Sequence, residues 1–223
     1  MRAATRTRAD VVHEITTSGL VAVVRLADAA SMRAVAEALM SGGVRAIEVT
    51  MTVPGAVELI AELSRSVPAH VIIGAGTVLD EATANAVIGA GAEFVVSPVL
   101  RPDVIELCRR QDVAVMPGCL TPTEILAAWQ AGADIVKVFP ATALGPTFFK
   151  DMRGPFPQIR MMPTGGVTRD NASDWIRAGA VAVGVGTALV DQRAVAARQF
   201  NVIADNARHF VAEVQRARGA TGA

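Results

Sequence analysis

The chain has 223 residues, of which 52% are hydrophobic and only 4% aromatic, with no tyrosine. Its 21 basic side chains balance its 21 acidic ones, so no net charge draws the protein to nucleic acid or to an acidic membrane. Every apolar run is interrupted before roughly 18 residues, and the two cysteines lack metal-binding spacing, so neither a membrane span nor a disulfide framework is expected. We therefore predict a protein of the reducing cytoplasm, with no nucleic acid or membrane as a partner.

The first predicted element is a helix over about residues 7–18, lying across one end of the fold. Eight short β-rich runs follow, and each is succeeded by a helix-like segment. Strands that alternate with helices of about ten residues indicate parallel βαβ units. The eight predicted strands cover residues 20–26, 46–51, 71–76, 94–98, 113–118, 135–140, 160–166 and 181–189.

Helix start signals lie between these strands, because a capping side chain accepts a hydrogen bond from the first turn and proline fits the first helical position. A final helix is predicted over 192–217. Eight βα units without a linker predict an α/β protein, a (β/α)8 TIM barrel, as a single domain over 1–223 with an extra N-terminal helix. The start signals are Ser31, Asp80, Thr121 with Pro122, and Asp170 with Asn171.

A short repeat precedes alternate strands, in the strings GGVRAIEV, AGAEFVVSP, AGADIVKVFP and AGAVAVGVG. Its aligned glycines fall where a helix has to stop, and glycine tolerates the left-handed conformation used there. Because each layer inside a barrel takes side chains from alternate strands, we expect Glu48 and Lys137 to face the same interior space. The aligned glycines are Gly43, Gly91, Gly132 and Gly179, and the fifth residues after them are Glu48, Val96, Lys137 and Gly184.

Lys137 is one of only two lysines in the chain, and it lies in the apolar run 135–140. An ammonium group is costly to remove from water, so burial favours the neutral amine. A neutral amine is a nucleophile toward ketones, which is the chemistry of Schiff-base enzymes. The alternative is that arginine-biased composition makes the residue conspicuous and that Lys137 reaches solvent from a strand end.

Glu48 and Arg25 also lie within apolar strands. We predict that Glu48 is a general acid/base whose pKa burial raises toward the working pH, and the alternative is a structural ion pair with Lys137 or Arg25. The planar guanidinium of Arg25 suits a substrate carboxylate, and a second buried cation would favour the neutral amine of Lys137. The alternative for Arg25 is a surface position at the strand end.

Glycine-rich stretches end the seventh and eighth strands, at 163–167 and 184–187. Loops after these strands commonly form the phosphate cradle of this fold, because glycine lets backbone N–H groups approach an anion closely. A third stretch, 74–77, is more typical of a wall, with Thr77 offering a hydroxyl. The three histidines have no metal-binding spacing, so we predict no metal and no cofactor.

Together these residues resemble one family, the 2-keto-3-deoxy-6-phosphogluconate (KDPG) aldolases, which also act as 4-hydroxy-2-oxoglutarate (KHG) aldolases. The resemblance implies a metal-independent class I aldolase, built as a (β/α)8 barrel and usually trimeric. The matching strings occur in the family's order from about residue 20 to residue 190. They are VAVVR, GGVRAIEVTMTVPGA, IIGAGTVL, AGAEFVVSP, MPGCLTPTEI, VKVFPA, GPFPQIRMMPTGGV and AVGVGTALV.

By this resemblance Lys137 forms the Schiff base and Glu48 is the general acid/base. Many family members carry an arginine four residues after that glutamate to hold the substrate carboxylate, whereas this chain has Thr52. Other members carry the arginine on the first strand, so we assign the carboxylate to Arg25. Thr77 is a further substrate contact, and the resemblance places the far wall and phosphate pocket at Thr164, Gly165, Gly166, Gly186 and Thr187.

The predicted reaction is the cleavage of KDPG, a phosphorylated 2-keto acid, to pyruvate and glyceraldehyde 3-phosphate, as in the Entner–Doudoroff pathway. Aldolases for KHG or for 2-keto-3-deoxy-6-phosphogalactonate are alternatives, and so are a phosphosugar epimerase or isomerase and a non-catalytic assembly module. The resemblance implies a homotrimer. Apolar surface left by four side chains would also favour an oligomer, and ordinary helix packing is their alternative: Phe148, Phe149, Met152 and Trp129.

Overall fold

The structure is a computed structural model that describes residues 6–27 and 30–219. Its strands are β1 Leu20–Val24, β2 Ala46–Thr50, β3 Ile72–Gly76, β4 Phe94–Val96, β5 Ala114–Met116, β6 Gly118–Cys119, β7 Val136–Val138, β8 Met161–Pro163 and β9 Val183–Val185. Its helices are α1 Arg8–Ser18, α2 Met32–Ser41, α3 Ala56–Ser66, α4 Glu81–Gly89, α5 Pro102–Arg110, α6 Pro122–Ala131, α7 Gly145–Arg153, α8 Ala172–Arg177, α9 Gln192–Ala196 and α10 Phe200–Gly219, with a 3₁₀ turn at Ala141–Ala143.

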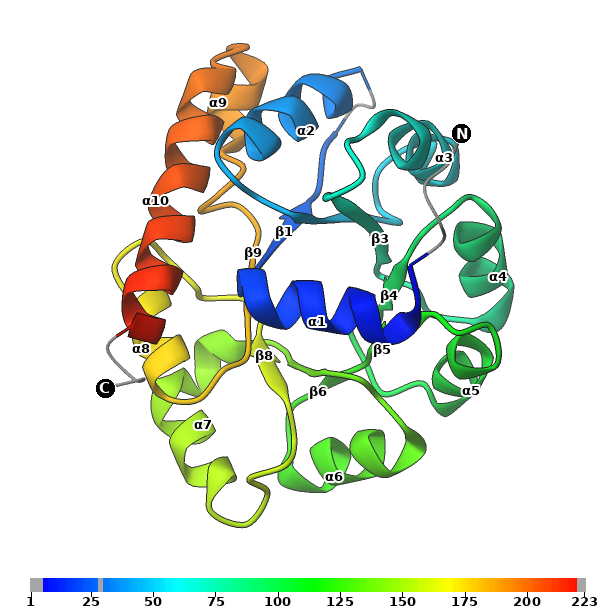
Figure 1. Cartoon of the computed structure of the whole chain (residues 1–223), viewed down its shortest axis with the longest axis vertical. Coiled ribbons are helices and arrows are strands. Elements are labelled where there is room, and N and C mark those ends of the chain that lie inside the picture. The colour runs from blue at the N-terminus through cyan, green and yellow to red at the C-terminus, as the bar shows by residue number, and fades with distance from the viewer. Residues whose placement is uncertain (1–5, 28–29, 220–223) are drawn as a thin grey trace.

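The parallel strands form two curled sheets, in the orders β5-β4-β3-β2-β1-β9 and β6-β7-β8. Pro117 separates β5 from β6 because it has no N–H to donate to a neighbouring strand. On the other side, a parallel bridge between Thr164 and Gly184 joins the two sheets. The predicted (β/α)8 barrel is therefore confirmed, with its fifth strand divided in two, and Figure 1 shows the helices around the strands.

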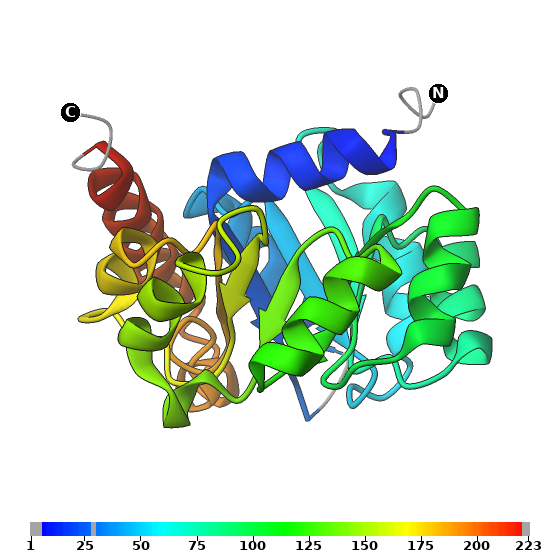
Figure 2. The same ribbon diagram turned by 90° about the horizontal axis from the view of Figure 1, so that it is seen from below.

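Side chains alternate along each strand, and this alternation separates two cores. Outward residues such as Ile47, Val49 and Val138 pack under the surrounding helices. Inward residues such as Ala46, Ile72 and Met162 fill the barrel, and Val11, Val12 and Ile15 of α1 belong to the same cluster. The predicted N-terminal helix therefore closes the amino-terminal end of the barrel, where Figure 2 shows α1 lying across it.

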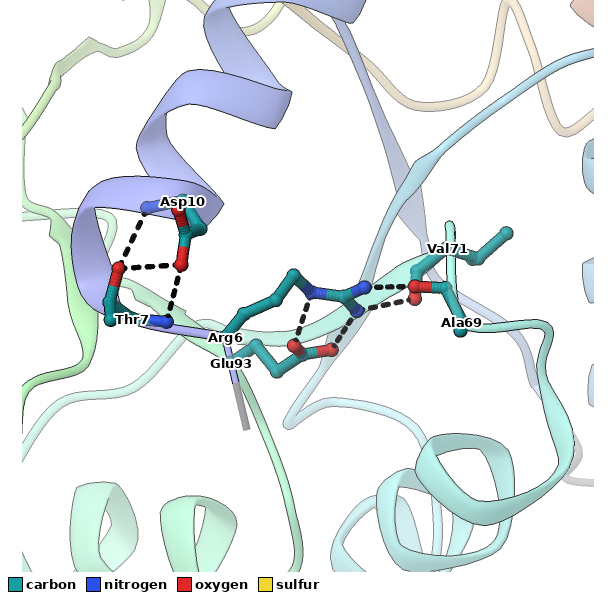
Figure 3. Close-up of polar contacts among 6 residues, drawn as sticks. All are labelled: Arg6, Thr7, Asp10, Ala69, Val71 and Glu93. Atoms are coloured by element: carbon teal, nitrogen blue, oxygen red, sulfur yellow. Dashed lines mark hydrogen bonds and ion pairs between the residues drawn. The ribbon is translucent and has the colours of Figure 1, made fainter. Parts of the chain in front are cut away.

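Polar contacts fix the start of α1 to the barrel. Arg6 forms a two-point ion pair with Glu93, with both nitrogen–oxygen distances at 2.8 Å, and also donates to the carbonyls of Val71 and Ala69 (Figure 3). Thr7 and Asp10 form a capping box, in which each side chain accepts a hydrogen bond from the other's backbone N–H. The N-terminal segment is thus attached where β3 and β4 begin.

Two further arginines complete this attachment. Arg8 pairs with the buried Asp134 at 2.9 Å, and the other oxygen of that carboxylate accepts the N–H of Val115 at 3.0 Å. Arg218 of α10 donates to the carbonyl of Thr16 at 2.5 Å and to that of Val181 at 2.6 Å. Both ends of α1 are therefore held by guanidinium groups.

The four repeat glycines have φ angles of 92° to 105°, so the predicted left-handed helix stops are confirmed. Asp80 and Thr121 cap their helices as predicted, but Ser31 and Asn171 form no capping hydrogen bond. The single last helix predicted over 192–217 is wrong. Arg198, with φ of 55°, lies in the break between α9 and α10.

Four side chains were predicted to leave apolar surface uncovered, with ordinary helix packing as the alternative. The structure shows them packed, so the alternative is correct. Phe149 and Met152 are buried, and Phe148 and Trp129 pack against the same core. Within residues 6–27 and 30–219, no helix combines the length and apolarity needed to cross a membrane. The extent of the domain to both chain ends stays a prediction.

Candidate active site

The two groups predicted to be reactive continue the inward-facing series beyond the apolar layer. Glu48 on β2 and Lys137 on β7 lie two residues after Ala46 and Ile135, which are both part of the interior cluster. A two-residue step along a strand returns to the same face, so both side chains enter the barrel. Glu48 is 1% exposed and Lys137 is 5% exposed, which places both charges in a largely dry interior.

Glycine on the neighbouring strand makes the room that Glu48 occupies. A Cβ atom at Gly76 would lie 1.8 Å from Oε1 of Glu48. Neither carboxylate oxygen has a hydrogen-bond partner among the described residues, and the ion pair with Lys137 or Arg25 is not formed there. Burial therefore raises the pKa of Glu48, and the positive charges of Lys137 and Arg25 oppose this shift in part.

An aromatic ring lies against the amine of Lys137. The Nζ atom is 5.0 Å from the ring centroid of Phe139, a distance at which a ring face attracts a cation. Phe139 is half-buried and also lines the cavity beside the reactive pair. The sequence analysis did not single out Phe139, although its position two residues after Lys137 puts it on the same face.

A cavity opens beside this pair, at the carboxyl ends of the strands. It brings together six of the residues predicted as substrate contacts, and the described residues that line it include no acidic side chain. Its lining includes neither Lys137 nor Glu48, but it includes Phe139, whose ring lies against the amine of Lys137. Its lining is Val23, Arg25, Phe139, Thr164, Gly165, Gly166, Val167, Gly184, Gly186, Thr187, Ala188, Val190 and Gln192.

The loop after β8, predicted as part of a phosphate cradle, contains two successive glycines with positive φ angles. Gly165 and Gly166 have φ angles of 85° and 77°, and a Cβ atom at Gly166 would lie 2.9 Å from Cα of Thr142. Asn171, predicted as a helix cap, instead accepts the N–H of Thr168 at 2.8 Å and donates to the carbonyl of Gly166 at 2.9 Å. This asparagine holds the loop because its carboxamide both accepts and donates.

The remaining predicted contacts are placed differently. Arg25 is exposed at the end of β1, so the prediction of a second buried cation is wrong. Thr77 is half-buried after β3 and does not line the cavity. Thr52 is exposed, and its hydroxyl lies 2.8 Å from that of Thr50. Among the described residues, no cluster of three or more His, Cys, Asp or Glu could hold a metal ion.

One type of reaction uses all three features of this site: the buried amine, the buried carboxyl group with a raised pKa, and the adjoining cavity free of acidic groups. The amine can add to a ketone, the carboxyl group can move protons beside it, and the cavity can hold an anionic end of the same compound. The fold and site thus define a Schiff-base aldolase of the barrel class.

Comparisons with known proteins agree with this class. The family model described as KDPG and KHG aldolase matches residues 11–205. The 2-dehydro-3-deoxy-phosphogluconate aldolase of Treponema pallidum (strain Nichols) is 37% identical over 169 residues, which are 75% of this chain and 80% of that protein. The probable 2-dehydro-3-deoxy-6-phosphogalactonate aldolase of Rhizobium meliloti (strain 1021) is 35% identical over 187 residues, 79% of this chain and 88% of that protein.

Solved structures give the same answer. A structure described as native KDPGal has a TM-score of 0.84 at 30% identity, covering 90% of this chain and 96% of that one. The KDPG aldolase of Legionella pneumophila, with pyruvate captured as a covalent carbinolamine intermediate, has a TM-score of 0.82 at 28% identity. The match covers 88% of this chain and 96% of the Legionella pneumophila chain. The chain belongs to the KDPG and KHG aldolase family.

Proposed function

We propose that this protein cleaves KDPG to pyruvate and glyceraldehyde 3-phosphate through a Schiff base on Lys137. The observation that carries the proposal is the burial of Lys137 and Glu48 on the same inward face of the barrel, with no partner for the carboxylate among the described residues. A buried acid without a structural partner has a cost in stability, which a catalytic role accounts for.

The first half of the reaction is attack on the ketone. The neutral amine of Lys137 adds to C2 of the substrate to give a carbinolamine, which loses water and becomes an iminium ion. Glu48 then removes the proton of the C4 hydroxyl. The C3–C4 bond breaks, its electron pair moves toward the iminium nitrogen, and glyceraldehyde 3-phosphate leaves.

The second half returns the proton and releases the product. The remaining enamine takes a proton at C3 from the Glu48 carboxyl group, either directly or through a water molecule. Water then adds to the iminium carbon, and the carbon–nitrogen bond breaks to free pyruvate and the amine. Because Glu48 first accepts a proton and then donates it, a pKa raised toward the working pH serves both steps.

Borohydride trapping tests this proposal directly. Reduction of the imine with pyruvate should add to the intact protein the mass of pyruvate less one oxygen atom. The chain offers a matched control, because its other lysine, Lys150, is exposed on α7. We expect Lys150→Ala to be trapped like the wild type and Lys137→Ala to stay unmodified. A wild-type mass that does not change would refute the mechanism.

Substrate choice is tested separately. The cavity with glycine loops and no acidic side chain supports a phosphorylated substrate. We therefore expect a higher kcat/KM for KDPG than for unphosphorylated KHG. The galactonate-derived compound carries the same phosphate, so the proposed choice of KDPG over it is tested by comparing kcat/KM for the two phosphorylated compounds. Isomerase or epimerase activity that survives in Lys137→Ala would favour the alternative enzyme class, and a trapped adduct excludes a purely structural barrel.

The proposal extends to the assembly and setting of the enzyme. We propose a cytoplasmic homotrimer acting in the Entner–Doudoroff pathway, with Arg25 and Thr77 among its substrate contacts. Three large exposed apolar side chains support an interface, because they follow successive strands at one end of the barrel: Leu79, Val99 and Leu120. Sedimentation equilibrium gives the mass in solution, and a monomer would refute the trimer.

A further inference from the structure

The ring of Phe139 is the aromatic neighbour of the amine of Lys137. The Nζ atom lies over the ring face, 5.0 Å from its centroid. Among the described residues, Nζ has no hydrogen-bond or ion-pair partner, and the carboxylate of Glu48 is unpaired as well. The ring is therefore in position to interact with any positive charge that forms on this nitrogen.

Backbone hydrogen bonds on both sides of Phe139 fix the segment that carries this ring. The N–H of Phe139 donates to the carbonyl of Cys119 on β6 at 3.0 Å, and the N–H of Ala141 donates to the carbonyl of Thr164 at 2.9 Å. The ring also borders the glycine loop after β8, since a Cβ atom at Gly165 would lie 3.8 Å from Cε2 of Phe139. The two neighbouring strands thus hold the ring at the amine.

The charge on the lysine nitrogen changes during the proposed reaction. The carbinolamine is neutral, and it takes up one proton and loses water, which leaves one positive charge on the iminium nitrogen. When the C3–C4 bond breaks, its electron pair cancels that charge, so the enamine is neutral, and protonation at C3 restores the cation. A neighbouring group that attracts cations, but itself neither ionises nor takes a proton, stabilises the iminium at both stages.

An aromatic ring is such a group. Its face carries partial negative charge, and its attraction for a cation is stronger where water is excluded. Lys137 is buried, so its nitrogen is largely removed from water. We propose that Phe139 is a catalytic residue of this enzyme, whose ring stabilises the iminium form of Lys137 through a cation–π interaction. The inference rests on the proposed Schiff-base mechanism and adds one residue to it.

Fluorination of the ring tests this role while largely keeping the shape of the side chain. Phe139 is replaced by phenylalanine with one, two or three ring fluorines, because each fluorine withdraws electrons from the ring face. The rate of trapping by cyanoborohydride at increasing pyruvate concentration gives the apparent dissociation constant of the imine. At alkaline pH we expect this constant to rise stepwise, by roughly 2- to 30-fold with three fluorines. A constant that does not depend on fluorination would overturn the inference.

The pH dependence of this effect separates charge from packing. At alkaline pH the resting amine is neutral, and only the iminium is stabilised by the ring. At acid pH the resting ammonium is stabilised as well, and the two contributions offset each other. We therefore expect the effect of three fluorines to grow as the pH rises. An effect of the same size at every pH would show that the ring acts by packing alone, which contradicts the proposal.

Phe148 provides the matched control, because it is also half-buried but lies on α7. Three fluorines on that ring should leave the constant for pyruvate unchanged, and a rise equal to that at Phe139 would count against the assignment. Phe139→Leu keeps an apolar side chain without a π face, so it should weaken imine formation at least as much as three fluorines. Wild-type imine formation in Phe139→Leu would likewise refute the role of the ring. Circular dichroism checks that each variant is folded.

The two proposals fail in different ways. A wild-type enzyme that forms no adduct with pyruvate refutes the Schiff-base mechanism itself. A wild-type enzyme that is trapped normally, together with fluorinated Phe139 variants that form the imine equally well, refutes only the role of the ring.

Discussion

The two ends of the barrel treat their polar groups in opposite ways. At the amino-terminal end, Arg6, Arg8 and Arg218 each find carboxylate or carbonyl partners around α1. At the carboxyl-terminal end, both oxygens of Glu48 and the hydroxyl of Thr164 are buried without a partner among the described residues. The arginines at the amino-terminal end thus stabilise the fold, whereas the carboxyl-terminal end leaves a buried carboxyl group and a buried hydroxyl unpaired.

Glycine accounts for much of this contrast. At the closed end the inward positions carry Val, Ile, Phe and Met, which fill the barrel. At the open end Gly76 makes space for the Glu48 carboxyl group, and a Cβ atom at Gly184 would lie 2.4 Å from the hydroxyl oxygen of Thr164. Polar side chains can enter the barrel there because the neighbouring strands carry no side chain at those positions.

Lys137→Arg should produce the largest effect at the open end. A guanidinium stays protonated and cannot form an imine, so turnover should fall at least about 10⁴-fold, as when an essential nucleophile is removed. Steady-state cleavage of KDPG and borohydride trapping with pyruvate measure the loss. A variant that still forms the reduced adduct would show that the nucleophile lies elsewhere.

Gly76→Ala tests the space around the acid. The added methyl group would lie 1.8 Å from Oε1 of Glu48, so the carboxyl group has to move away from its position. We expect turnover to fall roughly 10²-fold, the scale of a lost general acid/base, while pyruvate trapping continues. Gly89→Ala is the matched control, because a Cβ atom there meets nothing within 4 Å. Full activity in Gly76→Ala would show that the carboxyl group of Glu48 does not have to occupy this position.

The strands and the faces of their side chains were the easier part to predict from sequence. The short β-rich runs gave the strands, and the repeat glycines gave the helix stops and the shared face of Glu48 and Lys137. The split of the fifth strand at Pro117 and the break at Arg198 depend on local backbone geometry, which composition does not specify. Helix capping by Asn171 was wrong because a tertiary partner, the loop at Gly166, competes for its carboxamide.

At the open end, the sequence predicted which residues belong to the site but not how their side chains are exposed or paired. The sequence indicated Arg25 and the glycine loops, yet the exposure of Arg25 depends on where β1 ends in the barrel. Gln192 carried no sequence signal, because its contact with Arg25 joins opposite ends of the chain. Contacts of this range follow from barrel closure, which local pattern does not encode.

Arg6→Ala tests the closed end. It removes a two-point ion pair with Glu93 and two hydrogen bonds to strand carbonyls (Figure 3). We expect the free energy of unfolding to fall by about 1–3 kcal/mol while kcat at 25 °C is retained. Arg33→Ala breaks the more exposed ion pair between Arg33 and Glu62 and should lower the free energy of unfolding by about 1 kcal/mol or less. Equal losses in the two variants, measured by urea unfolding, would argue against a special role for the Arg6 contacts.

The smallest expected effect is a pH dependence of stability that differs between the buried carboxyl group of Glu48 and the exposed carboxyl group of Asp80. Burial raises the pKa of Glu48 above its ordinary value of 4.5, so between that value and the folded-state pKa the unfolded chain ionises first and the native state loses stability. The loss is complete above the folded-state pKa, so the Tm of Glu48→Gln relative to wild type should rise with pH from 4 to 8. Asp80, whose pKa is lowered by its hydrogen bonds to Thr83, has the opposite sign: Asp80→Asn should have a lower Tm than wild type at neutral pH, and this difference should shrink as the pH falls below the ordinary Asp value of 3.8. A Glu48→Gln difference that stays constant with pH would show that the carboxyl group is not ionising in a dry interior.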